Sequence, residues 1–589
     1  MKINDYYLQE LHALRQTGAE FARENPGLSP YLAKEGQDPD VERLLEGFAF
    51  LTGRLRQQMD EELPELSHNL VQLLWPNYVR PIPSMSIIEY KPLTDAYKAQ
   101  TVSRGTQVLS HQSTSTQCRF KTVYETVVEA YEIKDVLYTV QGDKSTLSFD
   151  FSLSAGACVA DLSLESMRLH LLGSKLMAKE NYLFFSRYTD HLEFELLDSE
   201  HKVLETIQLS SKKIKPLGFD RDQTVLPYPR NVFDGYALLQ EYFCYEEKYY
   251  FINFEKLNLK NEFSEETLSS AASFRMNVKF NKRLPEAYKP TSDHFKLYCT
   301  PIVNLFSTDA TPIRKSSLEE EYMVVASEFK KDESEVFSID KVRGWVPSKS
   351  AYEDYEAFET FKEEGSSFYY STRVKLSIDA KRTQTFLRFA GSEGLYEELH
   401  HSNATVSVEF SSTNKDLPSR LAMGVINTSD PLSEVAHLEF ESITIPTFSY
   451  PPPIEGDFLW KIISNMSLNY LSLSDLKTLK TILKTYDFLG SYDQKQKEHT
   501  EHMLRGLHDV SYEHTSIIYQ GLPIKGVITT LEVIMTKFAS KGEMYLFCNV
   551  LNEFFALYGN INTFHQLRVE TDEGETFEWA AKMGYDVLK

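Results

Sequence analysis

The segment from Asp38 to Pro83 restricts the possible fold of this 589-residue chain more than any other stretch. Asp38 can cap a helix, and Pro39 suits the first helical position. Apolar residues then recur at helical spacing on one face, with Met59 following: Val41, Leu44, Leu45, Phe48, Leu51 and Leu55. The segment therefore predicts an amphipathic helix that ends near Glu62, because Pro64 cannot continue it.

Two internal glycines and a second helix complete this segment. Gly47 and Gly53 lie inside the first helix, where each costs about 1 kcal/mol relative to alanine. We therefore expect another helix to approach closely there. The second helix stops at Trp75-Pro76 and presents a row of leucines: Leu66, Leu70, Leu73 and Leu74. Either the rest of this chain or another chain has to cover these two apolar faces.

Composition and charge exclude several classes of protein. The chain has 62 Lys and Arg against 85 Asp and Glu, a net charge of −23. This balance argues against non-specific binding of nucleic acid or of an anionic membrane surface. No run of 18 apolar residues occurs, so we expect no membrane-spanning helix, and the amino terminus lacks the apolar core of a secretory signal.

The five cysteines lie far apart and include no C-x-x-C pair. This pattern predicts reduced thiols in a cytosolic protein. Cys118 and Cys244 stand beside aromatic residues, which favours buried thiols over nucleophiles.

Changes of residue spacing divide the chain into four parts and predict an α+β multidomain fold. Residues 1–83 form an N-terminal helical unit that begins with a helix over Asn4–Glu24. Residues 84–310 and 311–453 form β-sandwich-like middle domains with helical insertions near Ser174–Phe185 and Asp234–Tyr245. The strands are predicted from alternation of apolar and polar residues, clearest at Leu147–Leu153, Leu192–Leu196, Phe274–Phe280 and Val406–Phe410.

Residues 454–589 are expected to form a C-terminal α+β domain after a linker at Pro451–Pro453. Its strongest element is a helix over Glu543–Tyr558, with a capping box from Ser540 and Glu543 and a stop at Gly559. The apolar residues of this helix occupy one face, and strands are predicted on either side of it, at Val527–Phe538 and His565–Val569.

Signals for catalysis are weak. The chain contains no G-x-G-x-x-G, G-x-x-x-x-G-K-[ST], H-E-x-x-H or G-x-S-x-G. Ser474–Lys477 fits S-x-x-K, but this pattern is common by chance and more readily caps a helix. The acidic stretch Glu353–Gly365 is predicted to be a solvated loop or helix.

One histidine group has the residue types of a metal site: His499, His502, His508 and His514. His499 and His502 could share a helix face, and zinc takes imidazole ligands. The surrounding sequence is highly polar and lacks the apolar shell that holds metal ligands in place. We therefore favour a solvated helix or loop and expect no metal and no cofactor.

Several stretches, in order along the whole chain, resemble the TssF family, also called ImpG or VasA, of bacterial type VI secretion systems. The amino-terminal match covers YYLQELHALRQTGAEFARENP, DPDVERLLEGFAFLTGRLRQQMDEELPEL and LLWPNYVRPIPSMSI. Further matches are RGTQV, CRFKT, LPYPRNVFDGYALLQEYF, PIVNLF, TNKDLP, WKIISNMSLNYLSL, MLRG and LFCNVLNEFFALYGNINTF. One departure is Ser412, where the family pattern leads us to expect cysteine.

The resemblance implies a structural role and no enzymatic activity. It implies a subunit of the cytoplasmic baseplate, held at the inner membrane through the secretion membrane complex. Two copies would join one TssG in a wedge that also carries TssK, around the spike (VgrG) and near TssE, tube and sheath. The implied function is support of tube and sheath assembly and of contractile delivery of effectors.

This resemblance gives the segment at 38–75 two possible roles. In the first role it lies in a helical bundle shared between subunits, with an interface made by Val41, Leu44, Leu45, Gly47, Phe48, Leu51, Gly53, Leu55, Leu70, Leu74 and Trp75. The bundle could also close within the chain, because three helices can cover one another. Two other functions remain open: a wedge protein of a phage or phage-like contractile particle, and a β-rich hydrolase.

Overall fold

The computed structural model describes residues 7–8, 11–12, 14, 43–52, 54, 70–93, 98–111, 116–230, 232–316, 319–330, 332–346, 351–358, 368–377, 382–391, 405–431, 437–453, 475–519, 521–559 and 563–584. The chain forms two compact units, Met1–Val79 with Ile454–Ser467, and Arg80–Pro453 with Leu468–Lys589. Helices and several sheets are both present, which confirms the α+β multidomain class. The division into four domains stays a prediction.

The first unit is helical at residues 43–52 and 70–74. The second of these helices stops at Trp75, as predicted, because a 3-10 turn follows at Pro76–Tyr78. The Trp75 ring is buried and meets the Tyr78 ring edge-on, with centroids 4.0 Å apart. Most of the predicted Asn4–Glu24 helix and both ends of the Asp38–Glu62 helix lie outside the described residues.

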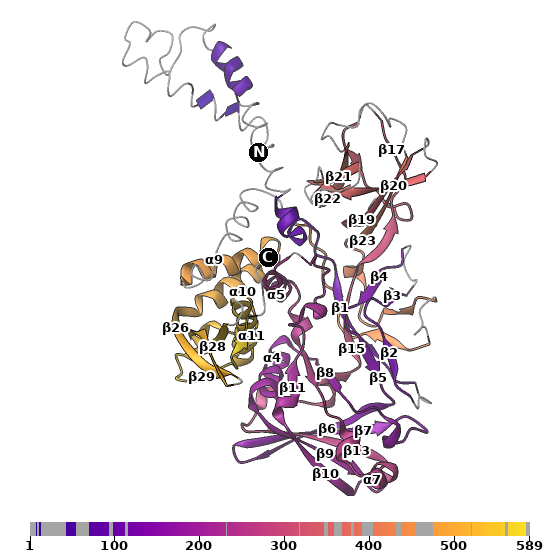
Figure 1. Cartoon of the computed structure of the whole chain (residues 1–589), viewed down its shortest axis with the longest axis vertical. Coiled ribbons are helices and arrows are strands. Elements are labelled where there is room, and N and C mark those ends of the chain that lie inside the picture. Colours follow the sequence, from indigo (N-terminus) through magenta and orange to yellow (C-terminus); the bar gives the residue numbers. More distant parts are fainter. Residues whose placement is uncertain are drawn as a thin grey trace. The chain divides into compact units, whose positions relative to one another are not determined.

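In the second unit, the three alternating stretches between residues 147 and 280 form neighbouring strands of one antiparallel sheet (Figure 1). Its order is β10-β9-β13-β7-β6. The strands are β6 (Tyr131–Gln141), β7 (Lys144–Leu153), β9 (Thr189–Leu197), β10 (Val203–Ser210) and β13 (Ser273–Phe280). Phe151 and Phe274 stack at 4.6 Å on the buried face, so the predicted alternation of buried and solvent-facing residues is confirmed.

Three further sheets complete the β-rich part of this unit. One has the order β24-β3-β4-β15-β1-β25 and a second the order β11-β12-β8-β14. Their strands are β1 (Met85–Tyr90), β3 (Gln107–Ser110), β4 (Arg119–Thr122), β8 (Met167–Leu171), β11 (Ile214–Pro216), β12 (Phe251–Phe254), β14 (Phe295–Leu297), β15 (Cys299–Val303), β24 (Ile426–Ser429) and β25 (Phe440–Ser442). The short strands β2 (Gln100–Val102) and β5 (Thr126–Val128) pair with each other.

The largest sheet contains β23 (Thr405–Thr413), which confirms the predicted strand at Val406–Phe410. Its other strands are β16 (Phe306–Asp309), β17 (Ile313–Arg314), β18 (Tyr322–Met323), β19 (Glu335–Val346), β20 (Ala351–Ala357), β21 (Phe368–Leu376) and β22 (Thr383–Gly391). The prediction of an acidic loop or helix at Glu353–Gly365 is wrong for the first part of this segment. β20 lies between β19 and β21, and the buried Tyr355 ring stacks on Phe368 at 5.2 Å.

The C-terminal elements of the second unit form a five-stranded sheet covered by helices. The strands are β26 (Leu507–Tyr519), β27 (Leu522–Val533), β28 (Phe564–Thr571), β29 (Thr576–Glu578) and β30 (Lys582–Met583). The helices are α9 (Leu476–Tyr486), α10 (Gln494–Arg505) and α11 (Lys541–Leu557). β27 and β28 are parallel, and α11 makes the crossover between them.

Two predictions for this region need correction. The Glu543 carboxylate accepts a hydrogen bond from Ala539 N (2.7 Å) and not from Ser540 N, so the reciprocal capping box does not form, although Ser540 Oγ caps Glu543 N. α11 is also buried on nearly all sides and not on one face. The reason is that α4 (Lys175–Leu183) and α5 (Asp234–Cys244), the two predicted helical insertions, pack against it from the middle of the chain (Figure 1).

Smaller differences concern helix and strand ends. α9 is capped by Asp475, whose carboxylate accepts from Thr478 N at 2.8 Å. The strand predicted over Val527–Phe538 ends at Val533, where a 3-10 turn at Met535–Lys537 begins.

Candidate interaction surfaces

The described helix in the first unit exposes an apolar stripe. Leu44, Phe48 and Leu51 are 73%, 56% and 60% exposed, and their spacing places them on one side of the helix. On another side Ala49 is fully buried, and Leu45 is half-buried. The helix is therefore apolar on two sides, of which the first unit covers one.

The other predicted interface residues do not all belong to this exposed stripe. A Cβ at Gly47 would have no heavy atom of the described residues within 4 Å, so the expected close helix approach is not found there. Leu70 is half-buried, Leu74 is exposed, and Trp75 belongs to the buried core. Val41, Gly53 and Leu55 lie outside the described residues.

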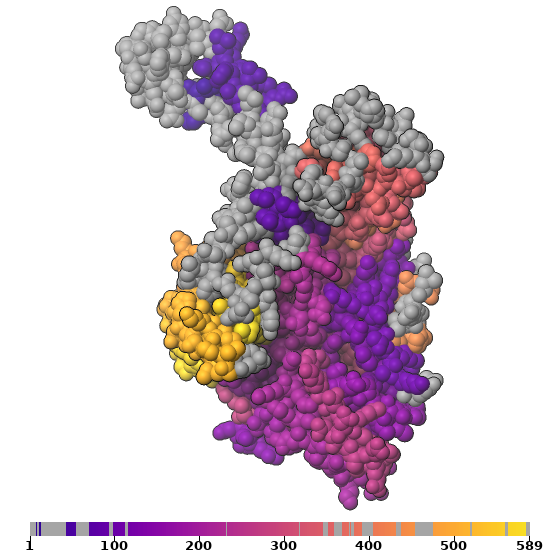
Figure 2. Space-filling model, in the orientation of Figure 1, coloured from indigo at the N-terminus to yellow at the C-terminus, as the bar shows by residue number. Residues whose placement is uncertain are grey.

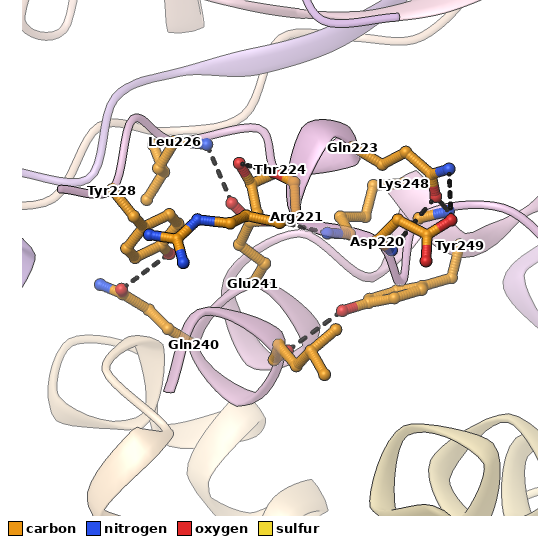
Figure 3. A network of polar contacts seen from close by, with 12 residues as sticks. Asp220, Arg221, Gln223, Thr224, Leu226, Tyr228, Gln240, Glu241, Lys248 and Tyr249 are labelled. Carbon is orange, nitrogen blue, oxygen red and sulfur yellow. Dashed lines mark hydrogen bonds and ion pairs between the residues drawn. The ribbon is translucent and has the colours of Figure 1, made fainter. Parts of the chain in front are cut away.

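In the second unit, a buried ion pair holds the stretch LPYPRNVFDGYALLQEYF together (Figure 3). Lys248 Nζ contacts the Glu241 carboxylate, and both side chains are fully buried. The other Glu241 oxygen accepts from Leu226 N at 2.9 Å, and Tyr228 OH donates to Gln240 Oε1 at 2.9 Å. Burial lowers the pKa of Lys248, against the opposing effect of Glu241. Because these groups are buried and hydrogen-bonded, they form a structural joint between the loop that contains Leu226 and Tyr228 and the helix α5.

A second joint connects three of the recognised stretches. Asn304 of PIVNLF donates from Nδ2 to Arg119 O of CRFKT at 2.7 Å and to Asn414 Oδ1 of TNKDLP at 2.9 Å. Arg119 N donates to the same Asn414 Oδ1 at 3.0 Å. Ser412 is buried and donates to Glu335 O at 3.0 Å. In the sequence these stretches are separate family matches, and no sequence signal indicates that the two asparagines meet.

An ion network joins the middle of the chain to the C-terminal domain. Lys179 Nζ of α4 lies 2.8 Å from Glu543 Oε1 of α11 and 2.7 Å from Glu246 Oε1. His499 Nε2 of α10 lies 3.2 Å from the same Glu543 oxygen. Burial alone would raise the pKa of Glu543, but the His499 hydrogen bond and the Lys179 charge outweigh it and lower the pKa to about 2.

The histidine group does not converge. His502 Nδ1 contacts Lys537 O at 2.8 Å, and His508 and His514 lie on β26 and not on the helix that carries His499 and His502. Within the described residues, no three His, Cys, Asp or Glu side chains gather in a way that could hold a metal ion.

Four cysteines are buried, and Cys158 is exposed. Burial raises the pKa of the Cys118 thiol to about 12 and that of Cys244 well above its ordinary value, so the prediction of buried thiols at these two positions is confirmed. In the part of the chain that the structure describes, no helix is long and apolar enough to cross a membrane.

Comparisons with known proteins agree on one family. The family model "Type VI secretion system, TssF" matches residues 1–586. The chain is 26% identical to the type VI secretion system component TssF1 of Pseudomonas aeruginosa, over 99% of each protein.

Two solved structures resemble more than nine-tenths of the chain. One is a chain of a TssK-TssF-TssG baseplate subcomplex determined by cryo-electron microscopy, with a TM-score of 0.78 and 27% identity over 93% of this chain and 100% of that chain. The other belongs to the baseplate complex of a type VI secretion system, with a TM-score of 0.62 and 25% identity over 99% of this chain and 100% of that chain.

Proposed function

The chain belongs to the TssF family and is a structural baseplate subunit of the type VI secretion system, and we propose that it joins TssG and TssK in a wedge. The observation that carries this proposal is the match of 93% of the chain to a chain of a TssK-TssF-TssG baseplate subcomplex, together with the TssF family match over residues 1–586. We further propose that two copies enter each wedge, around the spike and close to TssE, tube and sheath, on the cytoplasmic side of the inner membrane.

The proposed role requires surfaces that bind other proteins and requires no catalytic centre. The buried charged groups of the second unit support a structural reading. The Lys248–Glu241 and Lys179–Glu543 pairs link separate segments of the chain, as expected of groups that fix a fold. We therefore propose that the protein has no enzymatic activity, and that neither nucleic acid nor a metal is bound.

We propose the stripe formed by Leu44, Phe48 and Leu51 as a contact with another subunit. Three large apolar side chains more than half exposed on one helix side are typical of a surface that a partner covers. Leu45, Leu70 and Leu74, which are half-buried or exposed, could extend this contact, as could Gly47. Val41, Gly53 and Leu55 stay predicted members. We leave out Trp75, since its ring packs against Tyr78 inside the chain.

Co-expression with TssG- and TssK-family proteins tests the baseplate role. We expect a stable complex that contains all three proteins, with two copies of this chain for each TssG, measured by native mass spectrometry. A chain that purifies as a monomer and binds neither protein would contradict the proposal. A complex with one copy would retain the baseplate role and reject the two-copy wedge.

A further inference from the structure

The strand β26 forms a long free edge of the C-terminal sheet. It pairs with β27 from Leu507↔Val533 to Tyr519↔Leu522. Among the described residues β26 has no other strand partner, so the backbone groups of its outer side point away from the sheet. The strand has 13 residues, which makes this edge about 40 Å long. Figure 2 shows the orange C-terminal region that carries β26 at the molecular surface.

This edge lacks the devices that protect other sheet edges. Natural edge strands carry bulges, prolines or lysines that prevent pairing with another chain. β6 has a bulge between Ile133 and Asp135, with Lys134 at the same place, and β10 has a bulge between Val203 and Glu205. The only irregularity of β26 lies at its start, and residues 510–519 contain no Pro, Gly, Lys or Arg. β26 is therefore open to strand pairing along most of its length.

The far end of the β26–β27 hairpin is apolar and exposed. β28 pairs with β27 only from Gly526 to Val533, so the end of the hairpin is a ribbon of two strands. Ile518 and Leu522 in this ribbon are 82% and 67% exposed. Two-stranded ribbons are marginally stable in water by themselves. A third strand beside β26 would cover part of this apolar surface.

Among the described residues, the solvent-facing side of the sheet carries more carboxylates than cations, and its Arg568 pairs with Glu578. Asp509, Glu532 and Glu570 lie directly beside one another on β26, β27 and β28, and all three are exposed. No ion-pair partner is found for them, or for Glu513 on the same side of β26, among the described residues. Like charges on opposite strand positions destabilise a sheet. A neighbouring strand with cationic side chains would relieve this repulsion.

We propose that β26 is a docking edge to which a neighbouring subunit of the baseplate subcomplex adds an extended segment with Lys or Arg alternating with apolar residues. The cations would lie beside Asp509 and Glu513, and the apolar residues beside Val510 and Tyr512, which point to the other side of the sheet. Main-chain hydrogen bonds would supply affinity, and the alternating side chains would supply specificity. A second copy is a poorer occupant, because β26 has no Lys or Arg and the chain carries a net charge of −23.

Hydrogen exchange tests the strand addition, which rests on the proposed baseplate function. The full chain alone is compared with the chain in its purified complex with the TssG- and TssK-family proteins. We expect every second amide of β26 to exchange at least about tenfold more slowly in the complex, because these amides gain hydrogen bonds. Amides of β28, which is paired on both sides, should change by less than about twofold.

Two matched variants give a second readout. Glu513→Lys places a cation on the free edge and should weaken binding to the partner proteins about tenfold, and more at low salt than at high salt. Glu570→Lys makes the same charge change two strands away and should alter binding less than about threefold.

The outcomes separate the strand addition from the baseplate role. A complex that forms while β26 exchanges at its original rate would overturn the strand addition and leave the baseplate role intact. Equal weakening by both variants would also overturn it. If the amides of β26 exchange more slowly in the chain alone as its concentration rises, the proposed partner is wrong and a second copy of the chain occupies the edge. Failure of the complex to form would overturn both proposals.

Discussion

Two helices with the same sequence signature have opposite environments in this protein. The helix at residues 43–52 and α11 both carry apolar residues at helical spacing and a glycine within the helix. Around α11 the packing is so close that a Cβ at Gly542 would clash with the backbone of Lys179. At Gly47 the space is open, and the neighbouring stripe is exposed. An apolar helix with an internal glycine predicts a close neighbour, but the pattern leaves open whether the neighbour belongs to the same chain.

The largest effect on stability is expected at the ion network that holds α11 against α4. Lys179→Met removes the cation beside the buried Glu543 and Glu246 and should reduce the free energy of unfolding by about 3–5 kcal/mol. Chemical denaturation would measure it. Lys91→Met removes a comparable contact from the exposed pair Lys91–Glu441 and should cost less than about 1 kcal/mol. Equal losses of stability in the two variants would show that burial does not make the Lys179 contacts stronger than the Lys91–Glu441 pair.

The close approach of α4 and α11 is tested at Gly542. Gly542→Ala forces the two backbones apart and should reduce the free energy of unfolding by about 1–3 kcal/mol, despite the better helix propensity of alanine. Thermal unfolding followed by circular dichroism would measure it. A variant as stable as the original protein would show that α11 does not pack this closely.

Gly47→Ala should raise the free energy of unfolding, in contrast to Gly542→Ala. Alanine is the better helix former and meets no described atom, so the helix should gain up to about 1 kcal/mol. If a partner helix approaches Gly47 in the assembly, the same variant should bind the TssG-family protein more weakly. Comparing unfolding temperature with binding affinity separates the two effects, and a loss of stability would indicate a close neighbour within the chain.

A smaller stability change is expected from His499, and it depends on pH. The hydrogen bond to Glu543 raises the pKa of His499 above its ordinary value. This contribution is fully present below about pH 6.5 and is lost as pH rises through the raised pKa. His499 is 45% exposed, so we expect His499→Ala to cost only about 0.5 kcal/mol at pH 6. The difference from the original protein should shrink by pH 9. A difference that grows with pH would contradict the assigned pairing.

The sequence predicted those elements whose structure is determined by a local pattern within their own residues. The strands at Leu147–Leu153 and Phe274–Phe280 follow from alternation, and the helix end at Trp75 follows from Pro76. The strand at Ala351–Ala357 was missed because its acidic residues resemble a solvated segment, while a single buried Tyr355 and pairing on both sides hold it in the sheet.

The candidate sites were only partly predictable for a similar reason. The apolar stripe at Leu44 and Leu51 is visible in the sequence, because its residues recur every three or four positions. The Asn304–Asn414 joint and the Lys179–Glu543 pair are not, since their partners lie more than 100 and 360 positions apart along the chain. The sequence assigned Glu543 only to a helix cap, and nothing local indicates that its carboxylate meets a lysine from α4.

The central claim is that another subunit covers the stripe of Leu44, Phe48 and Leu51. The most direct measurement is the binding of the double variant Leu44→Glu, Leu51→Glu to the TssG-family protein, with its unfolding temperature measured alongside. Because both side chains are exposed, we expect a change in stability within about 0.5 kcal/mol and a loss of binding. Ala49→Glu, at a buried position of the same helix, should instead destabilise the first unit. A double variant that unfolds, or one that stays folded and binds normally, would contradict the account.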